Sequence, residues 1–316
     1  MPRMKVVALA GGVGAGKFLR GLVRVMDPTD LTVVVNTGDD IDLFGLRVCP
    51  DIDSVVYWLS GVADRERGWG RADESFRALG EVKLLGGQSW FGLGDLDLGT
   101  HLTRADMLGS GASLTEATAA IAGGLGVRAS VLPMSEDRVT TRVEAVGEGG
   151  ERLELHFQEY WVARGARDNV KSIRYDGADG ARPAPAALGA IRGADAVVIC
   201  PSNPVASIGP ILAVNGMREE LSGLPVVGVS PIVGGAPLIG MADRLMPAVG
   251  LEVSAFGAAY AYRGLASGFV IDDRDAGLAT RIESELDIRV GTTDTIMTDD
   301  TAAERLARAA LDLMPR

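Results

Sequence analysis

Runs of apolar, β-branched residues alternate with amphipathic stretches along most of this 316-residue chain. The pattern predicts a strand over residues 6–10, then a glycine loop and a helix over about 17–26. Strands that are apolar along their whole length are typical of parallel sheets with both faces covered. Because helical stretches separate these strands, the sequence predicts a doubly wound, mainly parallel, Rossmann-like α/β sheet. Further strands are expected over 31–35, 129–132, 196–200 and 226–230, and further helices over 114–125 and 301–314.

The pattern changes between residues 140 and 175, where single apolar residues alternate with polar ones around the turn 147–150. This alternation predicts an antiparallel hairpin. We interpret residues 136–180 as a small antiparallel excursion from a single domain of residues 1–316. The uncharged stretch 221–242 contains three prolines, so we predict a buried strand and a loop there and no membrane span.

Composition narrows the choice of compartment and partners. Hydrophobic residues make up 47% of the chain and charged residues 23%, as expected for a globular protein. The net charge of −11 repels nucleic acid, so an anionic ligand must be held by local groups. Two cysteines, Cys49 and Cys200, are too few for a disulfide framework. Because the first residues also lack a long apolar stretch, we expect a cytoplasmic protein with no membrane partner.

The first candidate site is the glycine loop after the first strand. It nearly matches the phosphate loop GxxxxGK(S/T), but Phe18 stands where a hydroxyl would hold magnesium. It also departs from GxGxxG, because its third glycine comes one residue early. A strand, a glycine loop and a helix N-terminus still predict an anion site, with a ligand-free tight turn as the alternative. The expected phosphate-binding residues are Gly11, Gly12, Val13, Gly14 and Lys17.

Acidic residues follow the second predicted strand and recur about ten residues later. Carboxylates together with substrate phosphates are the usual environment of Mg²⁺, so we predict a magnesium site beside the glycine loop. In the alternative interpretation, Asp39 and Asp40 cap a turn and Asp53 caps a helix over 54–60. The set comprises Asn36, Thr37, Asp39, Asp40, Asp42, Asp51 and Asp53. Of these, we expect Asn36 and Thr37 to bind the donor nucleotide or its phosphates.

Two further segments could bind a ligand. Residues 90–101 combine aromatics, glycines, Asp95, Asp97 and His101, which predicts a pocket for a flat polar ring; a structural role for His101 is the alternative. Polar residues also follow two later strands and could contact a base, a ribose or a phosphate, with capped turns as the alternative: Ser202, Asn203, Ser207, Ser230 and Gly234. HExxH, GxSxG and metal-type Cys/His clusters are missing, so a hydrolase or zinc enzyme lacks support.

Taken in order along the chain, several short motifs resemble the family of 2-phospho-L-lactate transferases of coenzyme F-420 biosynthesis. One such motif is weak evidence, whereas this many in the family's order is specific. They are GGVG at 11–14, VVNT at 34–37, CPDID at 49–53, GDLDLGTH at 94–101, HFQEYW at 156–161, PSNP at 201–204 and VSPIVG at 229–234.

The resemblance implies transfer of a phosphoenolpyruvyl or 2-phospho-L-lactyl group from a diphosphoguanosine donor. The acceptor is the ribityl hydroxyl of the deazaflavin Fo (7,8-didemethyl-8-hydroxy-5-deazariboflavin), and GMP is released. A Mg²⁺ ion held by Asp40 and Asp53 is implied, as is a homodimer. Asp53 and Gly92 would lie beside the deazaflavin, although family members often carry lysine or another residue where Gly92 stands. The guanosine diphosphate would lie on loops 11–14 and 201–207.

Two other classes remain open from the residues. A nucleotide-sugar-binding regulatory protein of the gluconeogenesis-factor type has a similar GGxG start, but we expect it to lack the 94–101 segment. A small-molecule kinase would need the hydroxyl that Phe18 replaces.

Overall fold

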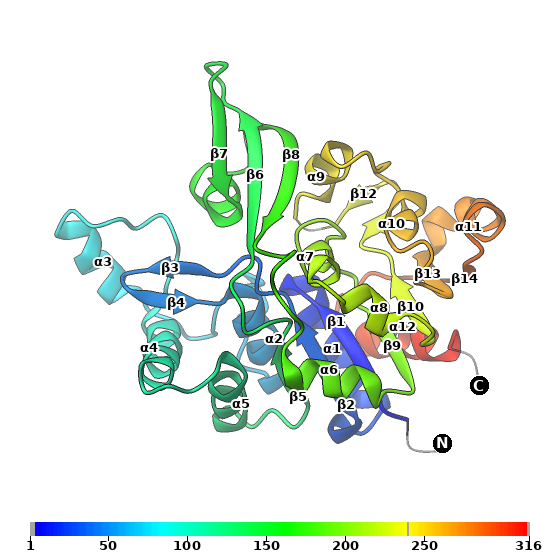
Figure 1. Ribbon diagram of the computed structural model, residues 1–316, viewed down its shortest axis with the longest axis horizontal. Helices are drawn as coiled ribbons and strands as arrows, with labels where there is room; N and C mark the ends of the chain where they lie inside the picture. Colours follow the sequence, from blue (N-terminus) through cyan, green and yellow to red (C-terminus); the bar gives the residue numbers. More distant parts are fainter. Residues whose placement is uncertain (1–3, 239, 315–316) are drawn as a thin grey trace.

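A seven-stranded parallel sheet forms the centre of the protein in this computed structural model, which describes residues 4–238 and 240–314 (Figure 1). Helices cover both faces of the sheet. The fold class predicted from the sequence is therefore confirmed. The strand order is β14-β13-β10-β9-β1-β2-β5, with β1 (Val6–Ala10), β2 (Leu31–Val35), β5 (Ser130–Pro133), β9 (Ala196–Ile199), β10 (Val226–Val229), β13 (Gly268–Asp272) and β14 (Arg289–Thr293).

The chain changes direction at the centre of this sheet. From β1 it proceeds outward through β2 and β5, and then returns to β9 on the other side of β1. Strands β1 and β9 are parallel neighbours, with Val6 opposite Ala196. The helices that follow these two strands pack on opposite faces of the sheet. In doubly wound sheets such a switch point opens a crevice for a ligand.

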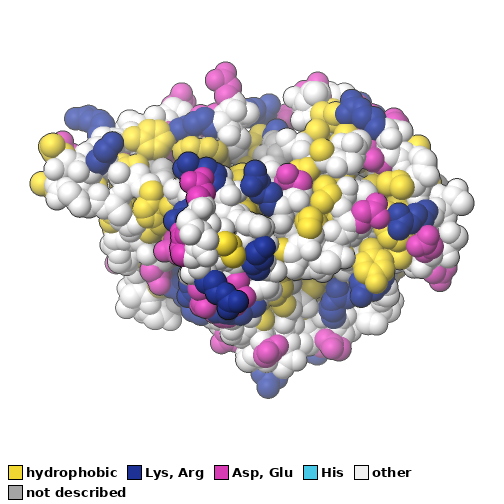
Figure 2. Space-filling model, turned by 90° about the horizontal axis from the view of Figure 1, so that it is seen from above, with side chains coloured by type: hydrophobic (Ala, Val, Ile, Leu, Met, Phe, Trp, Pro, Cys, Tyr) yellow, Lys and Arg dark blue, Asp and Glu magenta, His cyan; other side chains and the backbone are white. Residues whose placement is uncertain are grey.

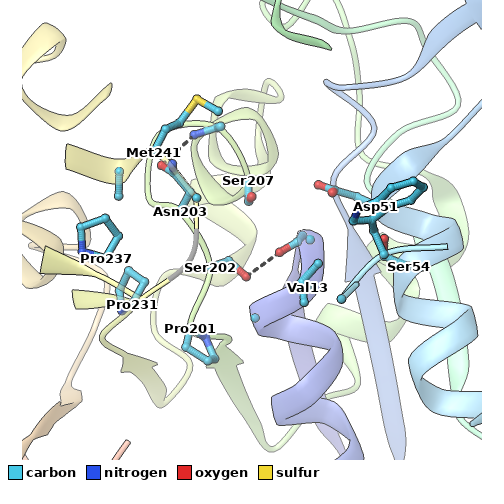
Figure 3. Close-up of a pocket in the computed structure, with 18 of the residues that line it drawn as sticks. Val13, Asp51, Ser54, Pro201, Ser202, Asn203, Ser207, Pro231, Pro237 and Met241 are labelled. Atoms are coloured by element: carbon cyan, nitrogen blue, oxygen red, sulfur yellow. Dashed lines mark hydrogen bonds between the residues drawn. The ribbon is translucent and has the colours of Figure 1, made fainter. Parts of the chain in front are cut away.

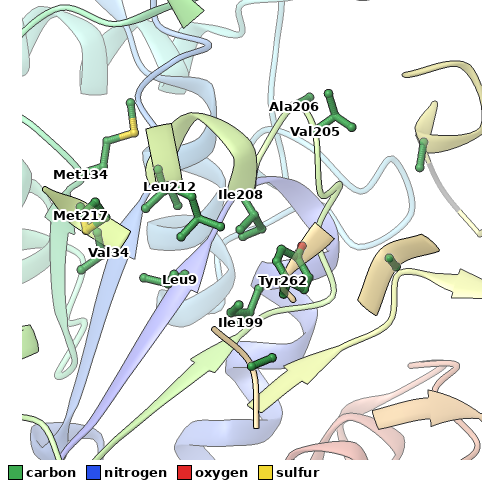
Figure 4. Close-up of a cluster of buried hydrophobic side chains, with 14 of the residues drawn as sticks. Leu9, Val34, Met134, Ile199, Val205, Ala206, Ile208, Leu212, Met217 and Tyr262 are labelled. Carbon is green, nitrogen blue, oxygen red and sulfur yellow. The ribbon is translucent and has the colours of Figure 1, made fainter. Parts of the chain in front are cut away.

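Alternate residues of the strands feed two separate cores. Val7 and Leu9 of β1 face one core, while Val6, Ala8 and Ala10 face the other. The first core also contains Met134, Ile199 and Tyr262 (Figure 4). This first core is covered by α6 (Pro185–Arg192), α7 (Ile208–Ala213), α8 (Met217–Leu221), α9 (Ala242–Ala248), α10 (Ala255–Ala261) and α11 (Ala279–Leu286). The second core is covered by α1 (Gly12–Val25), α2 (Pro50–Ser60), α5 (Leu114–Gly124) and α12 (Asp300–Asp312).

Smaller elements extend from this frame. A three-stranded antiparallel sheet of order β7-β6-β8 stands away from the main sheet at the top of Figure 1. It contains the predicted hairpin and one strand more, and a π-helical turn, Glu159–Ala163, precedes the third strand. The small elements are β6 (Thr140–Val146), β7 (Arg152–His156), β8 (Asn169–Asp176), the hairpins β3 (Ile41–Leu43) with β4 (Leu46–Val48) and β11 (Ile232–Val233) with β12 (Ala236–Pro237), and helices α3 (Arg77–Leu84) and α4 (Asp95–Gly109).

Three predicted boundaries were wrong. Helix α1 starts at Gly12 and not at 17, so the glycine loop itself forms the first helical turn. Helix α2 starts at Pro50, which suits a first helical turn because proline lacks the N–H that is unpaired there. Asp53 is consequently inside this helix and does not cap it. Residues 95–101, expected as a pocket loop, begin helix α4. Within residues 4–238 and 240–314, no helix is both long and apolar enough to span a membrane.

Candidate functional site

A cavity of about 690 Å³ lies at the switch point of the sheet. Its walls come from the glycine loop, the acidic segments, the loops after β9 and β10, and the turn between β7 and β8. In Figure 3, Val13 and Asp51 approach it from one side, and Asn203 and Pro231 from the other. Twelve of the residues predicted from the sequence line it: Gly11, Gly12, Val13, Gly14, Lys17, Asp39, Asp51, Gly92, Ser202, Asn203, Ser207 and Ser230.

The N-terminus of α1 points at this cavity. Gly11 precedes the helix without a side-chain cap, and the first turn contains no acidic residue. The Gly12 amide faces the Asp51 carboxylate, and the next amides, of Val13 and Gly14, remain available to an anion. A Cβ at Gly11 would lie 2.6 Å from Asp51 Oδ2 and equally close to Ser207 Cβ. A Cβ at Gly14 would lie 2.4 Å from the Pro201 carbonyl oxygen. Glycine is thus required for the loops after β1 and β9 to touch.

Two carboxylates face the same space. Asp39 and Asp51 line the cavity and are 4% and 7% exposed. Asn36 orients Asp51 by donating from Nδ2 to Oδ2 over 2.9 Å, which gives this predicted residue a supporting place behind the wall. Burial raises the pKa of Asp51, and burial together with the Asp51 charge raises the pKa of Asp39 well above its usual range.

This carboxylate pair fits a divalent cation. Asp39 Oδ1 is buried and has no hydrogen-bond partner among the described residues. Two desolvated acids side by side are stabilised by a bound positive charge. The described part of the chain has no group of three or more His, Cys, Asp and Glu side chains that could hold a metal. Magnesium is commonly held by one or two carboxylates plus substrate phosphates, so a pair is sufficient.

The structure places the predicted metal pair, Asp40 and Asp53, behind the cavity wall and not in its lining. Asp40 Oδ2 accepts from Arg47 Nε at 2.9 Å and from Cys49 Sγ at 3.1 Å. Asp53 forms a buried ion pair with Arg104, whose Nη1 donates to Oδ2 over 3.2 Å. Each carboxylate is therefore already neutralised by an arginine. The Asp53–Arg104 pair could not be predicted, because the two residues are 51 positions apart in the sequence.

The predicted ring-binding segment divides into two parts. Gly92 lines the cavity beneath Trp69, where a Cβ would approach the indole ring to 2.9 Å. Asp95 instead accepts from the Ala78 amide over 3.0 Å, at the start of α3. Asp97 accepts from the Gly94 amide over 3.4 Å, at the start of α4.

His101 also lies away from the cavity. Its Nδ1 is 3.6 Å from Asp53 Oδ2, and burial lowers its pKa. The structure therefore does not bring Asp95, Asp97 or His101 to the cavity wall.

The loops after β9 and β10 supply polar groups to the opposite wall. Asn203 Oδ1 accepts from the amides of Val205 at 2.9 Å and Ala206 at 3.2 Å. Its amide NH₂ has no partner in the described part of the chain and remains available to a ligand. Ser202 Oγ donates to the Gly11 carbonyl over 2.9 Å and joins the two loops (Figure 3).

Besides Asn36, two of the predicted donor-site residues lie outside the lining. The amide of Gly234 donates to Asp275 Oδ2 over 2.8 Å and so fixes the β11–β12 turn. Thr37 is buried at 1% exposure next to the acidic loop and does not reach the cavity.

Several lining residues had not been predicted. Gln158 and Trp161 belong to the HFQEYW motif at 156–161, which carried the family resemblance but had no expected ligand contact. Arg67 and Trp69 belong to no motif, and the sequence offers no signal for them. Together with Phe91, the two tryptophans give the cavity an aromatic wall. The antiparallel excursion thus delivers part of the site, because its π-helical turn carries Trp161.

Comparison with known proteins gives consistent results. The family model described as 2-phospho-L-lactate transferase CofD matches residues 6–306. The phosphoenolpyruvate transferases of Streptomyces griseus and Mycolicibacterium smegmatis are 49% and 40% identical, each over 98% of both chains. The 2-phospho-L-lactate transferase of Methanosarcina barkeri is 39% identical over 98% of both chains. A solved structure of a UPF0052-family protein from Bacillus halodurans aligns with a TM-score of 0.66 at 18% identity, over 98% of this chain and 99% of that one, and supports the fold.

Proposed function

The chain belongs to the 2-phospho-L-lactate transferase (CofD) family, and we propose that this transferase moves a phospho-acid from its diphosphoguanosine donor to the ribityl hydroxyl of Fo, releasing GMP. One observation carries the proposal. A single cavity is lined by a helix N-terminus, two carboxylates and an aromatic wall. The relatives named phosphoenolpyruvate transferase favour the enolpyruvyl donor.

The donor diphosphate would bind at the start of α1. The amides of Val13 and Gly14 and the ammonium of Lys17 are the positive groups there. The unpaired amide of Asn203 faces the same space from the loop after β9 and is available to the ribose or the base. The donor would therefore lie across the switch point, as dinucleotides do in related folds.

We propose that Asp39 and Asp51 hold the expected Mg²⁺, in place of Asp40 and Asp53, because only the first two line the cavity. A bound Mg²⁺ would neutralise the negative charge on the diphosphate. Asp40 and Asp53 then have a structural role behind the cavity wall. The pair of Asp40 with Arg47 fixes the β3–β4 hairpin, and the pair of Asp53 with Arg104 fixes α4 against α2.

Fo would lie along Trp69, Phe91 and Trp161, where a planar ring finds apolar surface. Gly92 allows the ring to approach the backbone. The ribityl hydroxyl then attacks the phosphorus that bears the acid, and the bond to the GMP phosphate breaks. Phosphoryl transfer depends mainly on alignment and charge neutralisation, which the groups lining this cavity would supply together.

The proposal is tested by mass spectrometry of products formed from Fo with the enolpyruvyl and lactyl donors, with Mg²⁺ and after its removal by chelator. We expect product and GMP only with Mg²⁺ present. Asp51→Asn should lower turnover at least tenfold (about 1.4 kcal/mol of barrier), whereas the exposed Asp42→Asn should leave it unchanged. GDP should raise the melting temperature more than ATP. Full activity of Asp51→Asn in chelator would contradict the metal assignment, and absence of product with both donors would contradict the reaction.

We also propose a homodimer in the cytoplasm. The dimer is proposed from exposed leucines: Leu84, Leu85 and Leu102, at α3 and α4, are 77%, 83% and 58% exposed. The cytoplasm is proposed because Cys49 and Cys200 are free. On the face shown in Figure 2, basic and acidic side chains are interspersed and form no continuous basic surface for nucleic acid. Light scattering during size-exclusion chromatography measures the oligomeric state, and Leu102→Glu should shift a dimer toward monomer. A monomeric wild type would contradict this part of the proposal.

A further inference from the structure

We propose that Arg67 binds the carboxylate of the acid being transferred and thereby selects acidic donors. Arg67 lies in the loop between α2 and α3 and lines the cavity together with Gly68 and Trp69. The inference rests on the proposed function, because it assigns a partner to one group of the proposed donor.

The Arg67 guanidinium is held in place before any ligand arrives. Its Nε donates to Asp64 Oδ2 over 2.7 Å, and Nη2 donates to the Arg71 carbonyl over 2.8 Å. The guanidinium carbon lies 5.1 Å from the centre of the Trp69 ring and 5.4 Å from that of Phe76. A guanidinium has five N–H donors, and these contacts use two of them, so three remain for a ligand. Such a fixed fork matches the geometry of a carboxylate.

Arg67 also lies at the right point along the cavity. A Cβ at Gly68 would be 3.5 Å from Val13 Cγ1, so this loop touches the phosphate-binding turn. Trp69, two residues beyond Arg67, covers Gly92 on the acceptor side. The transferred acid must lie between the donor phosphates and the acceptor hydroxyl, which is the interval that the Arg67 loop spans.

Arg67 is the better placed of the two cations in the cavity wall, although its Nε already pairs with Asp64. Lys17 and Arg67 are the two positively charged side chains among the described residues that line the cavity. Lys17 lies in α1, near the amides expected to hold the diphosphate. A carboxylate that loses water in this cavity is stabilised by a nearby cation, and the Arg67 loop spans the interval where the acid is expected.

The test separates the acid from the nucleotide by measuring two affinities without Fo. Calorimetry with lactyl-diphosphoguanosine and with GDP is performed on wild type, Arg67→Gln, Arg67→Lys and the control Arg65→Gln. Arg65 is a suitable control because its side chain pairs with Asp300 on the surface. We expect Arg67→Gln to weaken the acid-bearing donor about tenfold or more and GDP less than about twofold. Arg67→Lys should recover part of the loss, and Arg65→Gln should resemble wild type. Melting temperatures confirm that the variants are folded.

Two results would overturn the inference. Equal losses for the donor and GDP would place Arg67 on the diphosphate, and unchanged donor affinity would remove it from the site. Failure of the proposed function is distinguishable, because it appears in the wild type as absent GDP binding and absent product. In that case the inference about Arg67 falls with it.

Discussion

Gly14 is where the two loops of the site approach most closely, and the substitution Gly14→Ala tests that contact. The added Cβ would be 2.4 Å from the Pro201 carbonyl oxygen, although such contacts essentially never fall below 3.0 Å. Helix α1 and the loop after β9 must therefore separate by about 0.6 Å or more. Forcing a methyl group into a packed contact costs about 1–3 kcal/mol of unfolding free energy.

Gly99→Ala provides a matched control. Gly99 lies inside α4, and a Cβ there meets nothing within 4 Å. Both substitutions replace a helical glycine by alanine, which alone stabilises by about 0.5–1 kcal/mol. Their difference in unfolding free energy thus isolates the strain, and we expect Gly14→Ala to be less stable than Gly99→Ala by about 1–3 kcal/mol.

Urea unfolding measures the stability difference, and calorimetric titration with GDP measures its effect on the site. Widening the gap between the α1 amides and the loop after β9 should weaken GDP about tenfold in Gly14→Ala, with no change in Gly99→Ala. Equal stability and equal GDP affinity in the two variants would refute the close contact on which the site is built.

Three further predictions concern two buried acids and the aromatic wall. Asp53→Asn should lower the unfolding free energy by about 3 kcal/mol, because it leaves the fully buried Arg104 charged without its partner. In urea unfolding, the added substitution Arg104→Met should recover part of that loss, and additive effects of the two substitutions would argue against the pair. Burial raises the pKa of Asp97 from 3.8 to about 6. The stability that its bound proton contributes is therefore present below about pH 4 and lost as pH rises through about 6. Asp97→Asn should gain stability relative to wild type between pH 5 and 7.5, and parallel stability–pH profiles would contradict this. Trp161→Ala should weaken the affinity for Fo, measured by fluorescence titration, several-fold while leaving GDP affinity unchanged, since Trp161 belongs to the aromatic wall of the cavity.

The sheet was predictable from the sequence because local patterns determine it. Residues 6–10 and 31–35 are continuous apolar runs, and the structure gives β1 and β2 the same bounds. Boundaries near the glycine loop and Pro50 were less accurate, because tertiary contacts there outweigh helix propensity. The glycine loop is held as a helical turn by Asp51 and Pro201, which are distant in sequence.

The site was predictable only in part, for a similar reason. Gly11 to Gly14 and Asn203 follow strands whose ends meet at one edge of the sheet, so their proximity follows from the fold. The sequence could not distinguish Asp39 from Asp40, or Asp51 from Asp53. That distinction depends on which carboxylate finds an arginine, and Arg104 comes from a helix far along the chain. Arg67 and Trp69 lie in an irregular loop whose course no periodicity reveals.

The pairing of β1 with β9 has a consequence for how the protein is made. Val6 and its partner Ala196 are 190 residues apart, so during synthesis at about 5–20 residues per second one edge of β1 waits about 10–40 s for its neighbour. The outer face of α1 waits longer, since Gly21 packs against Ala303 of α12. An open apolar strand edge invites wrong pairing in that interval. Nucleotide binding can therefore appear only after nearly the whole chain has emerged, and an early-arrested chain should be a client of chaperones and not a partial enzyme.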